Sequence, residues 1–170
     1  MSKEIRSVLI TIVFLIFIYL LSFLGTGIDI EIKTFNAFNY LLGLSVVIQI
    51  LFFIPSFLFK TEKLYDLIGS STYLIVISYA YFSIDDKTVT DTLLFIFVST
   101  WAVRLGTYLF TRINRDKEDV RFEKAKKNFF WFLQYWMGQA LWVSITSCAA
   151  VIAILKNEHN SLNIFIILGS

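Results

Sequence analysis

An arginine set inside an apolar segment is the first feature of this sequence that suggests chemistry. Arg104 lies in Trp101–Ile113, WAVRLGTYLFTRI, and an arginine near the middle of a membrane costs about 2.5–3.5 kcal/mol on insertion scales. Either it has a partner, for which Asp66 is the candidate, or its stem carries the guanidinium toward the headgroups. Asp66 has its own alternative, because an acid in the first turn of a helix interacts favourably with the helix dipole. If this segment is helical, one face of the helix carries five residues, which are Trp101, Arg104, Tyr108, Arg112 and Arg115.

A densely charged segment follows this helix directly. Arg112–Lys127 holds seven lysines and arginines and four acids, and it is the largest hydrophilic segment in the chain. The arginines of Arg112–Arg121 could receive the phosphates of a dinucleotide, because a guanidinium fork matches phosphate oxygens. A basic loop that attracts anionic lipid headgroups explains the same residues as well. The sequence leaves both interpretations open.

A polar and aromatic stripe interrupts the last long apolar segment. It consists of Tyr135, Gln139, Trp142 and Thr146, at helical positions i, i+4, i+7 and i+11. Amides are costly against lipid, so such a stripe is expected to face protein or a cavity. It either forms hydrogen bonds between helices or contacts a substrate or cofactor.

The composition restricts the class of protein. The 170 residues are 57% hydrophobic and 18% aromatic, and they include one proline, which is typical of a multi-span membrane protein. Cys148 and His159 are the single cysteine and histidine, too few for an internal disulfide or a zinc site, so we expect no metal. A net charge of +2 gives no indication of nucleic-acid binding. The sequence has no glycine-rich phosphate cradle and no nucleophile elbow.

The apolar segments predict an all-α fold, a polytopic membrane helix bundle in a single domain, 1–170. We expect five complete transmembrane helices and the start of a sixth. The first is longer than the apolar core of a signal peptide, and more spans follow it. The predicted spans are Val8–Leu24, Ala37–Phe59, Tyr65–Ile84, Thr92–Thr111 and Asn128–Leu155, with Leu162–Leu168 beginning the sixth.

Lysines and arginines are distributed unevenly between alternate loops. Eleven lie at the N-terminus, in Lys60–Leu64 and in Arg112–Lys127, whereas the opposite loops hold three, which are Lys33, Lys87 and Lys156. The positive-inside rule therefore predicts that the N-terminus and the large basic loop, 112–127, are cytoplasmic.

Four segments resemble the DUF1295 family of membrane proteins. They are LYDLIG (Leu64–Gly69), WAVRLGTYLFTRI (Trp101–Ile113), RDKEDVRFE (Arg115–Glu123) and FWFLQYWMGQALWVSI (Phe130–Ile145). The resemblance covers roughly 60–153. That family is similar to the C-terminal domain of steroid 5-alpha-reductases and, more distantly, to isoprenylcysteine carboxyl methyltransferases.

The resemblance implies a membrane oxidoreductase that uses NADPH from the cytoplasmic side to reduce a carbon-carbon double bond in a sterol-like or lipid-like substrate. By the same resemblance, the cofactor would be bound by Arg104, Arg112, Asp119, Arg121 and Gln139. Structural or substrate-cavity roles would fall to Asp66, Trp101, Tyr135 and Trp142. No catalytic residue is assigned.

The related reductases carry a histidine-proline motif in a C-terminal cofactor region, and His159 has no proline after it. We therefore expect this chain to correspond to the N-terminal part of a family member. The alternative function is a non-catalytic membrane scaffold or a transport-associated subunit, in which the same residues only hold helices together. Membrane lipids are the expected partners in either case.

Overall fold

Five long helices make up most of the protein. The computed structural model describes residues 3–25, 28, 31–32, 35–116 and 119–156. The elements are α1 (Lys3–Leu21), η1 (Ser22–Gly25), β1 (Glu31–Ile32), β2 (Phe35–Asn36), α2 (Ala37–Leu58), α3 (Tyr65–Phe82), α4 (Val89–Asp116), η2 (Ala125–Lys127) and α5 (Phe129–Lys156). The predicted all-α class is confirmed, with β1 and β2 forming one short antiparallel pair.

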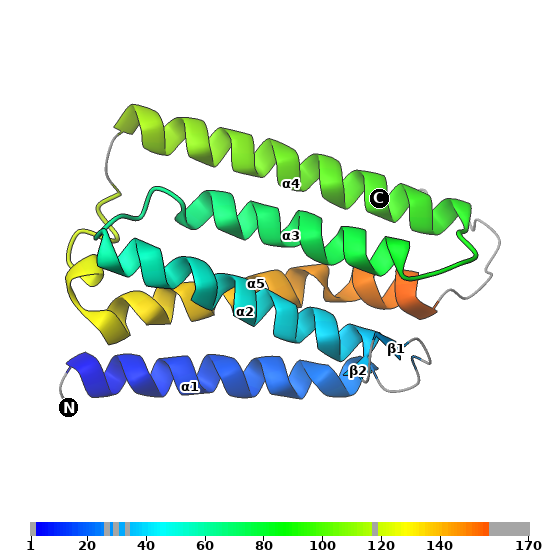
Figure 1. Ribbon diagram of the computed structural model, residues 1–170, viewed down its shortest axis with the longest axis horizontal. Coiled ribbons are helices and arrows are strands. Elements are labelled where there is room, and N and C mark those ends of the chain that lie inside the picture. The colour runs from blue at the N-terminus through cyan, green and yellow to red at the C-terminus, as the bar shows by residue number, and fades with distance from the viewer. Residues whose placement is uncertain (1–2, 26–27, 29–30, 33–34, 117–118, 157–170) are drawn as a thin grey trace.

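The helices lie side by side and alternate in direction (Figure 1). α5 packs against α1, α2 and α3, whereas α4 packs mainly on α3. α1 and α4 therefore form opposite flanks of the bundle, as Figure 1 shows. The start of α1, the link between α2 and α3, and the segment between α4 and α5 all lie at one end, which we call the loop end.

Four helices of the described residues are long and apolar enough to cross a membrane, namely Lys3–Gly25, Ala37–Leu58, Val89–Arg115 and Phe129–Lys156. α3 is less apolar because it opens with Asp66 and carries Gly69 and Ser70. α3 tolerates these polar and small residues because α2, α4 and α5 pack around it. The predicted sixth segment, Leu162–Leu168, lies outside the described residues.

The fourth helix is longer than the sequence predicted. It begins at Val89 and ends at Asp116, so Arg112 and Arg115 lie on the helix and not in a loop. A reciprocal cap explains its start: Asp91 Oδ2 accepts a hydrogen bond from Thr88 N at 2.9 Å, and Thr88 Oγ1 accepts one from Asp91 N at 3.2 Å.

Two contacts bring α3 close to its neighbours. A Cβ added at Gly106 of α4 would lie 2.9 Å from Ser70 Cβ, and one at Gly69 of α3 would lie 2.7 Å from Gln139 Cδ on α5. Small residues allow such close helix approach inside membranes. The Gly106–Ser70 contact fixes the antiparallel register of α4 on α3, which decides the geometry of the charged residues below.

Candidate functional site

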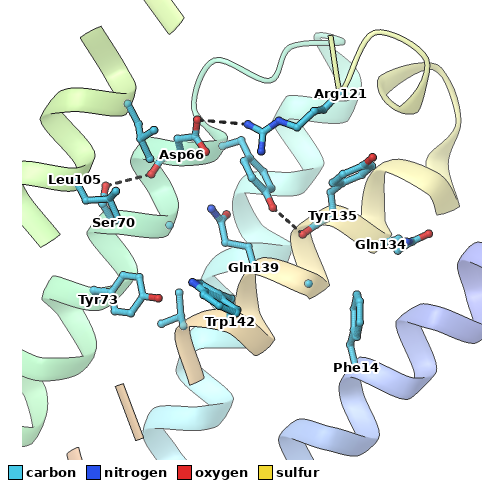
Figure 2. Close-up of a pocket in the computed structure, with 15 residues that line it drawn as sticks. Phe14, Asp66, Ser70, Tyr73, Leu105, Arg121, Gln134, Tyr135, Gln139 and Trp142 are labelled. Carbon is cyan, nitrogen blue, oxygen red and sulfur yellow. Dashed lines mark hydrogen bonds and ion pairs between the residues drawn. The ribbon is translucent and has the colours of Figure 1, made fainter. Parts of the chain in front are cut away.

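A cavity of about 500 Å³ lies between α3, α4 and α5 at the loop end of the bundle (Figure 2). α3 and α5 supply most of its wall, α4 supplies two leucines, and Arg121 and Phe14 complete it. The lining residues are Phe14, Tyr65, Asp66, Gly69, Ser70, Tyr73, Leu105, Leu109, Arg121, Gln134, Tyr135, Gly138, Gln139, Trp142 and Val143.

An ion-pair cluster borders the cavity at the loop end. Arg112 Nη2 on α4 lies 3.3 Å from Asp66 Oδ2 on α3 and 3.6 Å from Asp119 Oδ2. Arg121 Nη2 lies 4.0 Å from Asp66 Oδ2, and Arg121 Nε donates to both oxygens of Asp119 at 2.9 and 3.0 Å. The cluster holds two guanidiniums and two carboxylates, so its net charge is zero. It can therefore donate and accept hydrogen bonds without favouring a charged group.

Hydrogen bonding between Arg121 and Asp119 changes the ionisation of both side chains. The hydrogen bonds from Arg121 hold the pKa of the Asp119 carboxyl below its usual range. The same bonds raise the pKa of the Arg121 guanidinium. Both residues are consequently charged at neutral pH, and they form an ion pair in the segment between α4 and α5.

Glu62 holds this segment against the link between α2 and α3. Its side chain is almost fully buried, with Oε2 3.0 Å from Lys126 Nζ and Oε1 accepting a hydrogen bond from Asp119 N at 3.2 Å. Phe122, 1% exposed, packs between Tyr65 and Tyr135 at ring-centroid distances of 4.8 and 4.9 Å. The sequence analysis missed both residues. Two features of the sequence could have indicated them: Glu62 is an acid in a very short link between helices, and Phe122 is an aromatic residue within a charged segment.

Hydroxyl groups connect the cavity walls below the cluster. Tyr65 OH donates to the backbone oxygen of Tyr135 at 3.0 Å, joining α3 to α5. Tyr73 OH and Thr146 Oγ1 lie 2.5 Å apart and join the same helices farther along. In the stripe of α5, Tyr135, Gln139 and Trp142 thus line the cavity, whereas Thr146 bonds between helices.

Gln139 brings an amide into the cavity wall. Its Oε1 atom is buried and has no hydrogen-bond partner among the described residues, and its Nε2 end faces Gly69 (Figure 2). An unsatisfied buried acceptor costs about 1–3 kcal/mol. Since the final torsion of a glutamine is soft, a small rotation turns this oxygen toward a donor in the cavity.

Two of the predicted site residues lie away from the cavity. Arg104 is exposed on α4. The Trp101 ring packs edge-on against the Tyr73 ring, with 5.0 Å between their centroids, and does not line the cavity. The predicted pair between Arg104 and Asp66 is wrong. Because Gly106 contacts Ser70 and the helices are antiparallel, Asp66, one turn before Ser70, lies beside the turn after Gly106, and Arg112 reaches it.

Metal ligands do not gather in the described residues: no three histidine, cysteine, aspartate or glutamate side chains there converge on one point. Asp66 and Asp119, the two acids of the ion-pair cluster, are paired with arginines.

The chain matches a known protein family. The family model described as "Protein of unknown function (DUF1295)" matches residues 52–170. No curated protein and no solved structure matches the chain.

Proposed function

This chain belongs to the DUF1295 family, and from that premise we propose that it is a membrane protein that binds a neutral, lipid-like molecule in the cavity between α3, α4 and α5. The family model covers every helix that lines the cavity except α1.

The unpartnered Oε1 of Gln139 carries this proposal. This acceptor can be satisfied by a hydrogen-bond donor on the ligand. The ion-pair cluster beside the cavity has no net charge, so it does not favour a charged ligand. A hydroxyl group satisfies both conditions, because it donates to the amide and carries no charge. The polar end of the ligand is then a hydroxyl at the loop end.

Apolar and aromatic side chains supply the remainder of the wall. The cavity is lined by Leu105 and Leu109 of α4, by Phe14 of α1, and by residues of α3 and α5. Apolar walls with a few convergent polar groups are the usual features of a small-molecule site. Since α4 and α5 make few contacts with each other, a ligand could enter between them from the membrane.

We also propose an orientation of the protein in the membrane. We place α3 across the membrane as a fifth span beside the four apolar helices, with the loop end and residues 112–127 in the cytoplasm, because the lysines and arginines gather there. Single cysteines at Lys124 and Lys87, in a Cys148→Ser background, test it. In intact cells a membrane-impermeant thiol reagent should label the cysteine at position 87 and not that at 124, and the reverse result refutes the orientation.

Reduction of the bound molecule with NADPH remains a proposal drawn from the resemblance. The described residues do not fit the phosphates of a dinucleotide as they stand, because Asp66 and Asp119 occupy the guanidiniums of Arg112 and Arg121. We therefore expect weak binding of NADPH that falls steeply with salt and does not distinguish NADPH from ATP. Titration with both at two salt concentrations measures this, and salt-resistant, NADPH-selective binding would contradict it.

Fluorescence quenching by a brominated alcohol tests the cavity directly. Trp142 lines the cavity, so a dibrominated octadecanol should quench the purified protein in a saturable manner, and the dibrominated octadecanoic acid should do so more weakly. Trp142→Phe should remove the saturable part, whereas Trp101→Phe should retain it. Gln139→Leu should weaken binding about tenfold, the value of one lost hydrogen bond of about 1.4 kcal/mol.

Blocking the cavity provides a second test with a matched control. Leu105→Phe enlarges a lining side chain of α4, and Val103→Phe makes a comparable enlargement on the exposed face of the same helix. The first should reduce saturable quenching and the second should leave it unchanged. Quenching that does not saturate, or that is equal in all variants, would refute the binding site and would favour a scaffold role.

A further inference from the structure

A second cavity, separate from the cluster of acids and arginines, lies between the first turns of α1 and the start of α5. Its volume is about 340 Å³. The residues that line it are Lys3, Arg6, Ser7, Ile10, Trp131 and Gln134. Of these, Gln134 also lines the first cavity, so the two cavities are neighbours across α5.

The charge of this cavity is positive and unbalanced. Lys3 and Arg6 line it and no carboxylate does. The Lys3 Nζ atom lies over the Trp131 ring, 5.8 Å from its centroid, which keeps the ammonium beside the cavity. Glu4, the acid of the same turn, is outside the lining and accepts a hydrogen bond from Asn128 Nδ2 at 2.9 Å. The cavity therefore favours an anion, in contrast to the neutral cluster beside Gln139.

The polar groups of the cavity are free to bind such an anion. Ser7 is only 4% exposed, and its hydroxyl forms no hydrogen bond to any residue that the structure describes. Ser7 borders the open volume of the cavity, so its hydroxyl is available to a ligand. The Gln134 amide on the facing helix likewise has no side-chain hydrogen bond within the described residues. Two cations and two neutral donors thus surround one space, which suits a phosphate group.

The apolar side of the cavity continues along the helices. Ile10 lines the cavity, and one turn farther Phe14 packs against Gly138, where an added Cβ would lie 3.1 Å from a Phe14 ring carbon. The outer face of α1 beside this seam is apolar and exposed, with Leu9 48% and Val13 46% exposed. Positive charge at the end of an apolar helix and apolar surface beneath it match the two parts of a phospholipid.

We propose that this cavity binds an anionic phospholipid, with its phosphate between Lys3, Arg6 and Ser7 and an acyl chain along Ile10. A free phosphate has the same polar chemistry but gains nothing from the apolar part. Because α1 is held mainly by α5, a lipid that contacts both helices stabilises the attachment of α1 to the bundle.

Thermal unfolding of the purified full chain in a nonionic detergent tests this inference. Dioleoylphosphatidylglycerol at about ten times its dissociation constant should raise the Tm by about 3–6 °C. Dioleoylphosphatidylcholine and inorganic phosphate at the same concentration should not. Lys3→Gln/Arg6→Gln should lose most of the shift, whereas Lys124→Gln/Lys127→Gln, an equal loss of charge at the same end, should keep it.

A variant that retains both charges separates the cavity from general electrostatic attraction. Ser7→Leu fills the cavity, so it should also lose the shift and remains informative if the double variant fails to fold. An equal shift with both lipids, or a full shift in either cavity variant, would overturn the proposal. A shift reproduced by inorganic phosphate would assign the site to a free anion and would overturn the lipid.

Discussion

Asp66 on α3 is paired with Arg112 on α4, with 3.3 Å between Oδ2 and Nη2, and not with Arg104, the arginine in the apolar part of the same helix. The Asp66 side chain is 16% exposed and that of Arg112 is 33% exposed. Asp66 lines the first cavity, Arg112 lies beside it in the ion-pair cluster, and Arg104 is left on the exposed surface of α4.

Double-mutant cycles distinguish these two arginines. Asp66→Asn and Arg112→Gln should each destabilise the protein, with a coupling free energy of about 0.5–3 kcal/mol, because they remove the same contact. Asp66→Asn and Arg104→Gln should be additive within about 0.5 kcal/mol. Thermal unfolding of the single and double variants in one detergent gives both values. Coupling to Arg104 alone would contradict the pairing.

Glu62 should be among the residues most sensitive to substitution at the loop end. Its removal leaves Lys126 unpaired and the amide of Asp119 without an acceptor, so Glu62→Ala should destabilise the protein by about 3–5 kcal/mol. Glu123 is an exposed acid of the same segment, and Glu123→Ala should change the stability by less than about 0.5 kcal/mol. Equal losses of Tm in the two variants would show that the buried pair has no special role.

Helix packing at Gly106 can be tested against another helical glycine. Gly106→Ala places a methyl group 2.9 Å from Ser70 Cβ, which is fixed to the backbone of α3, so a loss of about 1–3 kcal/mol is expected. Gly43 has no atom within 4 Å of an added Cβ, so Gly43→Ala should stabilise α2 by up to about 1 kcal/mol. Gly69→Ala should cost less than Gly106→Ala, since the flexible end of Gln139 can move. The three Tm values decide the order.

Acid should loosen the segment between α4 and α5. The folded-state pKa of Asp119 is below its ordinary value of about 3.9, so its bonds to Arg121 contribute stability above that value and lose it as the pH falls through the lowered pKa. Limited proteolysis of this segment by pepsin, corrected for pepsin's own pH dependence on an unfolded peptide, should increase below about pH 4. In Asp119→Asn cleavage should already be raised and should vary little with pH. If cleavage of the wild type did not change with pH, the ion pair between Asp119 and Arg121 would not be what holds the segment in place.

The sequence by itself determined the features that depend on local composition. Long apolar segments specify helices whatever their neighbours are, so the all-α class, the approximate positions of the five long helices and the family were predictable. The gathering of basic residues in alternate loops also placed three charged segments at one end of the bundle. The predicted fourth span ended at Thr111, where the charged residues begin, whereas the helix continues to Asp116 because charged residues readily extend a helix beyond its apolar part.

Only the tertiary structure decided which charges meet. Helical periodicity placed Arg104 and Arg112 on one face, but the partner of Asp66 depends on how far α4 is displaced along α3, and that displacement is set where Gly106 contacts Ser70. Glu62 depends in the same way on distant residues, because its partners Lys126 and Asp119 lie in the segment between α4 and α5. Ion pairs and cavities act over a few ångströms, whereas a shift of one turn moves a side chain by about 5.4 Å, so the site is fixed by contacts between helices that no single segment encodes.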